Sequence, residues 1–118
     1  NMDSGMFYGI QKGAVEAFKL SNDWFKAQNE IYTKRRALVW QIFDALDCTY
    51  NKNIGGLFVW AKLPVGINSS EQFINNILTE KNIFIAPGTI FGSNGEGYIR
   101  FSLCIDEEEI KEAIKRFK

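Results

Sequence analysis

One arginine within an apolar strand is the residue in this sequence best suited to bind a ligand. Arg100 lies in the alternating segment 98–103, where Tyr98, Arg100 and Ser102 share one side and apolar residues share the other. Because an unpaired guanidinium among apolar neighbours is costly, Arg100 needs an anionic partner. Its planar fork of donors fits a carboxylate better than a lysine does. The pattern predicts an anion clamp or, alternatively, an edge arginine that pairs with Glu96 or with solvent.

A glycine-rich run over residues 88–97 is a second candidate, because such runs can cradle phosphate. A phosphate loop delivers its ligand to a helix N-terminus, and the Walker form adds a lysine. This run instead leads directly into the strand that begins at Tyr98. It also contains Asn94-Gly95, a strong turn pair. The run therefore favours a loop with turns.

Two charged clusters have simple interpretations. The acidic run Asp106-Glu107-Glu108-Glu109 is typical of a first helical turn, where negative charge suits the helix dipole, so we expect no metal there. The basic triplet Lys34-Arg35-Arg36 stands alone in a chain of zero formal charge. We interpret it as a solvated helix face with ion pairs rather than as a phosphate contact.

The side chains needed for many enzyme mechanisms are absent. The sequence contains no histidine, which excludes the usual general base and the Ser-His and Cys-His nucleophile pairs within this chain. Cys48 and Cys104 do not form a CxxC pattern, and two thiols do not complete a zinc site without histidine. We expect both to be buried, unreactive thiols in a reduced, cytoplasmic protein, with no metal site.

Composition limits the organisation of the chain. Its 118 residues, 46% of them hydrophobic, suit one domain over residues 1–118. Fourteen basic and fourteen acidic residues give a zero formal charge, which disfavours nucleic acid as a partner. No apolar run approaches the roughly 18 residues of a membrane span, so no membrane association is expected. Because the sequence opens on Asn1 and runs almost at once into a helical pattern, we expect a piece of something longer.

Hydrophobic periodicity predicts an α+β fold, a small three- to four-stranded sheet with helices packed on one face. We expect helices from about Gly5 to Phe18, from Ser21 or Asn22 to about Leu46, and from Asp106 to Phe117. A further helix should start around the capping sequence Asn68-Ser69-Ser70-Glu71 and carry Phe73, Ile74, Ile77 and Leu78. The expected strands are 57–63, 83–86 and 98–103, with Pro64 and Pro87 ending the first two.

Two expected surfaces lack cover. Asp3 or Ser4 would cap the first helix. Gly5, Gly9 and Gly13, four residues apart, leave a smooth stripe on that helix, which another backbone could approach closely. The first two strands are apolar on both sides. We therefore expect the face that holds Tyr98 and Arg100, beside Phe58 or Trp60, to meet another domain or subunit.

An ordered set of short motifs resembles a known family. The set comprises Asn1-x-Asp3-Ser4-Gly5 with Ile10-Gln11, Tyr32-x-x-Arg35-Arg36, Gly55-Gly56-Leu57-Phe58-x-Trp60, Pro87-Gly88-x-x-Phe91-Gly92, and Gly95-x-Gly97-Tyr98-Ile99-Arg100. Together these motifs resemble the C-terminal part of class I/II aminotransferases, fold-type I enzymes that use pyridoxal phosphate. Within the family the likeness is greatest to the branch of aspartate, alanine and LL-diaminopimelate aminotransferases.

The resemblance implies roles for particular residues. It places Arg100 on the α-carboxylate of an amino-acid or 2-oxo-acid substrate, and Asp3 and Ser4 near the neighbouring active site of a homodimer. It also implies that the sheet packs beside an upstream large domain. The lysine that forms the Schiff base with pyridoxal 5'-phosphate would precede Asn1, so this chain would hold no catalytic residue and would be inactive alone.

Two other functions remain open from the residues themselves. One is a free-standing module that grips a small anion or a peptide carboxylate through the face of Tyr98 and Arg100. The other is a purely structural dimerisation domain that uses the first helix as its interface. A full-length reading frame with a lysine beside an upstream strand would favour the aminotransferase.

Overall fold

The computed structural model describes residues 5–118, which fall into two compact units, residues 5–31 and 32–118. The helix α2, Asn22–Ala45, begins in the first unit and ends in the second. The expected cap residues Asp3 and Ser4 lie outside the described residues.

In the first unit the short helix α1, Tyr8–Ala17, buries none of its residues. It begins later than predicted: Phe7 is its N-cap and makes no side-chain capping bond, while Gly5 precedes the helix with a φ of +149°. Gly9 does serve a close approach, because a Cβ there would lie 2.5 Å from the ring of Phe7. The predicted stripe of three glycines is therefore wrong at Gly5.

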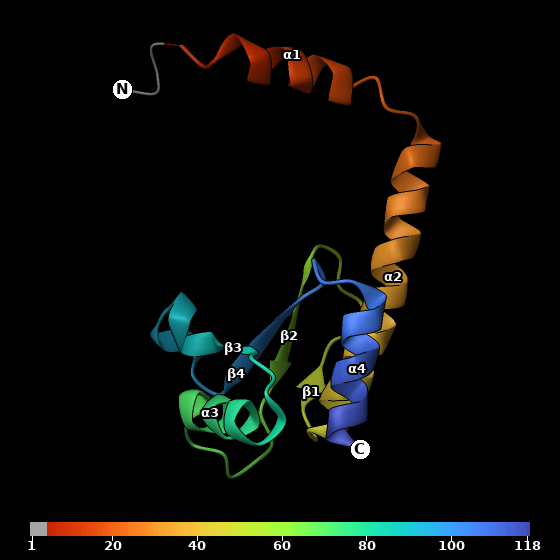
Figure 1. Cartoon of the computed structure of the whole chain (residues 1–118). Coiled ribbons are helices and arrows are strands. Elements are labelled where there is room, and N and C mark those ends of the chain that lie inside the picture. Colours follow the sequence, from red (N-terminus) through yellow and green to blue (C-terminus); the bar gives the residue numbers. More distant parts are fainter. Residues whose placement is uncertain (1–4) are drawn as a thin grey trace. The chain divides into compact units, whose positions relative to one another are not determined.

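The second unit is built around an antiparallel sheet of four strands in the order β1-β2-β4-β3 (Figure 1). Its members are β1 (Thr49–Tyr50), β2 (Phe58–Lys62), β3 (Ala86–Pro87) and β4 (Tyr98–Ser102). The central pair, β2 and β4, places Trp60 opposite Arg100 and Val59 opposite Phe101. The predicted α+β class with a small sheet is confirmed.

The edges of the sheet differ from the prediction. The strand β1 was not predicted; its two residues pair with Lys62 and Ala61. The strand predicted over 83–86 pairs only at Ala86 and Pro87, so it is shorter than predicted, and Pro87 is its last residue rather than the first residue after it. Proline is tolerated at this position because β3 is an edge strand that has no further neighbour to bond.

One face of the sheet packs on helices and forms the core. Alternation in β2 and β4 buries Val59, Ala61, Ile99 and Phe101 on that face. The C-terminal half of α2 covers them with apolar residues at three- and four-residue spacing, as do α3 (Ser70–Lys81) and α4 (Glu107–Phe117). The alternate residues of the two strands therefore point to the opposite face.

Capping residues fix where α3 and α4 begin. The hydroxyl of Ser69 accepts a hydrogen bond from the backbone N–H of Gln72, and the carboxylate of Asp106 accepts one from Glu109. The acidic run that begins at Asp106 is thus the cap and first turn of α4, as predicted.

The described residues contain no group of side chains arranged to hold a metal ion. Among the helices of residues 5–118, none is long and apolar enough to cross a membrane.

Candidate functional site

The outer face of the sheet, opposite the core, presents aromatic residues around Arg100. Phe58 and Trp60 of β2 and Tyr98 of β4 retain 41%, 38% and 38% of their surface, while Arg100 is half-buried among them. We call this set, together with Phe91 of the short 3₁₀ helix η2 (Gly88–Phe91), the aromatic face. It is the uncovered surface that strand alternation predicted.

Arg100 is held between two rings of the aromatic face. Its Cζ lies 4.0 Å from the ring centroid of Phe58 and 3.9 Å from that of Phe91. Such cation–π contacts attract a guanidinium and fix its plane. Phe91 is itself braced by Trp60, with ring centroids 5.3 Å apart in an edge-on arrangement. The side chain of Arg100 is therefore positioned before any anion arrives.

No anion from the described part of the chain neutralises Arg100. The ion pairs within residues 5–118 all use cations other than Arg100. The Nε of Arg100 is buried and has no hydrogen-bond partner. The two rings attract the cation through their faces and accept no hydrogen bond from the N–H groups that lie in the plane of the guanidinium. These N–H groups can therefore still donate to a carboxylate.

Glu96, the alternative partner weighed for Arg100, is bound elsewhere. Its Oε1 accepts hydrogen bonds from the hydroxyl and the backbone N–H of Ser70, each at 2.7 Å, and from the N–H of Gly97 at 2.9 Å. These bonds, led by that from the Ser70 hydroxyl, lower the pKa of Glu96. The reading of Arg100 as an edge arginine paired with Glu96 is therefore wrong.

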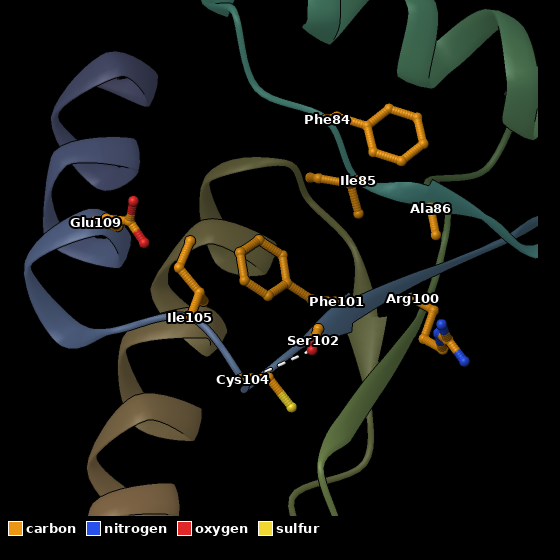
Figure 2. Close-up of a pocket in the computed structure, with 9 residues that line it drawn as sticks. All are labelled: Phe84, Ile85, Ala86, Arg100, Phe101, Ser102, Cys104, Ile105 and Glu109. Carbon is orange, nitrogen blue, oxygen red and sulfur yellow. Dashed lines mark hydrogen bonds between the residues drawn. The ribbon is translucent and has the colours of Figure 1, made fainter.

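A cavity of about 500 Å³ adjoins Arg100 where β3 stops pairing with β4 (Figure 2). Apolar side chains line most of it, and Arg100, Ser102, Cys104 and Glu109 add polar groups. Its position follows from the short edge strand, since β4 continues to Ser102 while β3 pairs no further along it than Arg100.

The two cysteines differ in exposure, contrary to the prediction that both are buried. Cys104 is exposed and lines the cavity beside Arg100, because it follows the end of β4, where the alternation of the strand no longer applies. Cys48 is buried, and burial together with the charge of Asp47 raises its pKa to about 11. Cys48 therefore fits the prediction of an unreactive thiol.

The basic triplet also differs from the prediction of a solvated, ion-paired face. Arg35 and Arg36 are half-buried, and their guanidinium groups donate to the carbonyl oxygens of Leu103 and Gly56, each at 2.9 Å. Leu103 follows β4 and Gly56 precedes β2. These arginines therefore fasten α2 to the ends of the two central strands, which sequence periodicity alone did not reveal.

A family model for class I and II aminotransferases matches residues 6–117. That match includes the aromatic face, Arg100 and the loop that carries Phe91. The chain belongs to the class I and II aminotransferase family. The resemblance drawn from the motifs is thus confirmed.

Curated relatives of the chain include two bacterial enzymes. The chain is 37% identical to the LL-diaminopimelate aminotransferase of Maridesulfovibrio salexigens over 98% of its own length. It is 39% identical to the LL-diaminopimelate aminotransferase of Halothermothrix orenii over 100% of its own length. In both comparisons the match covers 30% of the relative. The chain therefore spans about 30% of the length of these curated relatives.

Solved structures give the same picture. Substrate-bound BacF from Bacillus subtilis matches 95% of this chain with a TM-score of 0.78 and 29% identity, over 29% of its own length. An aminotransferase from Staphylococcus aureus matches 95% of this chain with a TM-score of 0.76 and 35% identity, over 30% of its length. The fold of this chain is thus shared with about 30% of the length of these two proteins.

Strand alternation predicted Arg100 beside Phe58 or Trp60, and the contact with Phe58 agrees with this, but the contact with Phe91 was not predicted. Phe91 occurs in a quoted motif, yet nothing in the spacing indicates that the loop folds back over β4. The contact with Phe58 depends on the pairing of β2 with β4, where Phe58 lies opposite Ser102. The alternation of both strands was the available signal, since it places Phe58 and Arg100 on one face once the register is known.

Proposed function

We propose that this chain is the C-terminal part of a pyridoxal-phosphate-dependent aminotransferase, in which Arg100 binds the α-carboxylate of the amino-acid or 2-oxo-acid substrate. The observation that supports this most directly is the environment of the Arg100 guanidinium. It lies between the rings of Phe58 and Phe91 and forms no ion pair with a carboxylate of residues 5–118. A charge-assisted, two-pronged bond to a carboxylate would supply the missing partner and would orient the substrate.

Pyridoxal phosphate, which the family implies, supplies an electron sink for the α-carbon of the substrate. None of the lysines in residues 5–118 is buried, whereas a lysine that reacts with a carbonyl group is typically desolvated. We therefore place the cofactor-binding lysine in another part of the protein and infer that this chain is inactive alone. Its own contribution is to bind and orient the substrate.

The rest of the protein would complete the site. The aromatic face is apolar and exposed in this chain, so we infer that a larger domain covers it and excludes water from the bound substrate. The exposed apolar residues near α1, among them Phe7 and Phe18, suit contact with that domain or with a second subunit of a homodimer. Two free cysteines agree with a cytoplasmic protein.

The decisive experiment compares substrates in the full-length protein. Arg100→Lys keeps the charge but removes the planar fork, so transition-state stabilisation for an amino acid, calculated from the ratio of kcat/KM values, should weaken by about 1.5 to 3 kcal/mol. LL-diaminopimelate is the first donor to assay, because the curated relatives carry its name. The corresponding amine, 1,5-diaminopentane, keeps the amino groups of LL-diaminopimelate without either carboxylate and should show no such loss. Arg116→Lys on α4 is the matched control, and it should leave both rates unchanged.

Normal turnover by Arg100→Lys together with a lower melting temperature would make Arg100 structural and would overturn the proposal. An equal loss for the amino acid and the amine would also contradict it, because the missing contact would then not involve the carboxylate. A free-standing module would bind carboxylates without a cofactor. A dimerisation domain would tolerate Arg100→Lys with no change in substrate use.

A further inference from the structure

Glu96 is the centre of a hydrogen-bond cluster that does not touch Arg100. Its Oε1 accepts from the backbone N–H and the hydroxyl of Ser70 and from the N–H of Gly97. The N–H of Gly97 also lies 2.9 Å from the Ser70 hydroxyl. Ser70 is completely buried, so its hydroxyl depends on these partners for its hydrogen bonds. Such a cluster costs free energy if one member is removed.

The cluster joins two elements that are distant in the sequence. Ser70 is the first residue of α3, and its N–H is one of the donors that a helix leaves unpaired in its first turn. A carboxylate is favoured there by the helix dipole as well. Glu96 lies directly after the 3₁₀ helix η3 (Ser93–Gly95) and two residues before β4. Its side chain therefore fastens the end of the loop 88–97 to the start of α3.

The same loop is closed at its other end by backbone contact. A Cβ at Gly88 would lie 2.1 Å from the carbonyl oxygen of Gly95, so the two backbone segments that meet at the base of the loop are in direct contact, with no side chain between them. We call this contact of Gly88 with Gly95 the loop neck. Between these closures the chain turns through η2 and η3, and Phe91 is the last residue of η2. The path of the loop therefore sets where the ring of Phe91 lies over Arg100.

We propose that Glu96 is a positioning residue for the carboxylate clamp: by holding the loop 88–97 on α3, it keeps Phe91 stacked on Arg100. This inference rests on the proposed function of Arg100. Glu96 acts through Phe91 and makes no contact with the substrate. Its loss would leave the guanidinium present but no longer held from one side, so the substrate carboxylate would bind more weakly.

The test uses Glu96→Gln in the full-length protein. The glutamine retains the shape and one acceptor oxygen but loses the charge that the Ser70 donors favour. We expect KM for the amino acid to rise about three- to twentyfold with a smaller change in kcat. The corresponding amine without the α-carboxylate should be affected less than threefold. Glu80→Gln is the matched control, because Glu80 is exposed on α3 and its side chain makes no hydrogen bond to the described residues; KM should stay unchanged for both substrates.

A second pair of variants keeps the inference testable if Glu96→Gln does not fold. Ser70→Ala removes only the hydroxyl donor from the cluster and should raise KM in the same direction, by a smaller factor. With Phe91 already replaced by leucine, neither Glu96→Gln nor Ser70→Ala should raise KM further, because the ring they position is gone.

The outcomes separate this inference from the proposed function. If Arg100→Lys abolishes the preference for the carboxylate substrate while Glu96→Gln and Ser70→Ala leave KM unchanged, Glu96 has no positioning role. Equal losses for amino acid and amine in Glu96→Gln would make its role merely structural and would also overturn the inference. If Arg100→Lys itself spares the carboxylate preference, the proposed function has failed, whatever Glu96 does.

Discussion

The guanidinium of Arg100 lies 3.9 Å from the ring centroid of Phe91, although the two residues come from different elements, β4 and η2. Phe58 contacts the same guanidinium at 4.0 Å. A cation held in this way has already lost much of its rotamer freedom, so an incoming carboxylate meets a preorganised partner. The relation between Arg100 and its rings therefore connects the fold to the proposed binding of substrate.

Replacing Phe91 with leucine should weaken substrate binding without unfolding the protein. Leucine keeps an apolar side chain but removes the ring that attracts the cation, a contact worth about 0.5 to 2 kcal/mol. KM for the amino acid in the full-length protein should therefore rise about two- to thirtyfold. Ile90→Leu is the control, since Ile90 is an exposed neighbour on η2. An unchanged KM would show that the stacking on Arg100 contributes nothing to binding.

Gly88→Ala should displace the loop neck. The added methyl group would lie 2.1 Å from the carbonyl oxygen of Gly95, which is backbone and does not rotate away. We expect a loss of about 1 to 3 kcal/mol in unfolding free energy, seen as a lower melting temperature, and a higher KM. Gly55→Ala has open space around its new Cβ and should change neither value. A native melting temperature for Gly88→Ala would contradict the close contact.

Alkaline pH should destabilise the isolated chain through Cys48. Burial raises its pKa from 9.0 to about 11, so the folded state keeps its proton where the unfolded chain releases it. The unfolding free energy that this group contributes is therefore complete below pH 9 and declines as the pH rises to about 11.

Tyr50 should extend that decline. Burial and its hydrogen bond to Asp44 raise its pKa from 10.0 to about 12, so its contribution is lost between those values. Urea unfolding from pH 8 upward measures both effects. Cys48→Ala should flatten the first part of the decline and Tyr50→Phe the second. A profile that neither substitution alters would disprove these assignments.

The isolated chain of 118 residues should associate at high concentration and bind an apolar dye. Its aromatic face exposes Phe58, Trp60 and Tyr98 together, and an apolar patch of this kind normally has a partner. Trp60→Ser should reduce both signals. Val65→Ser removes a single exposed side chain outside that face and should not. A strictly monomeric chain without dye binding would count against a missing domain over the aromatic face.

The sequence determined the features that depend on neighbours along the chain. Periodicity and capping residues located α3 and α4 closely, because Ser69 and Asp106 satisfy donors only a few residues away. Alternation in β4 put Arg100 on the face opposite the core, since successive strand residues point to opposite sides. The need of Arg100 for an anion followed from the same alternation and from the cost of an unpaired charge.

Only the tertiary structure decided which distant residues meet. The register of β2 on β4 places Phe58 against Arg100, and the path of the loop 88–97 places Phe91 there. Glu96 is hydrogen-bonded to Ser70 at the start of α3 and therefore does not pair with Arg100. The carbonyl partners of Arg35 and Arg36 and the exposure of Cys104 belong to the same class. These contacts join residues that are far apart in the chain, and their geometry depends on strand register and loop path, which local sequence preferences do not encode.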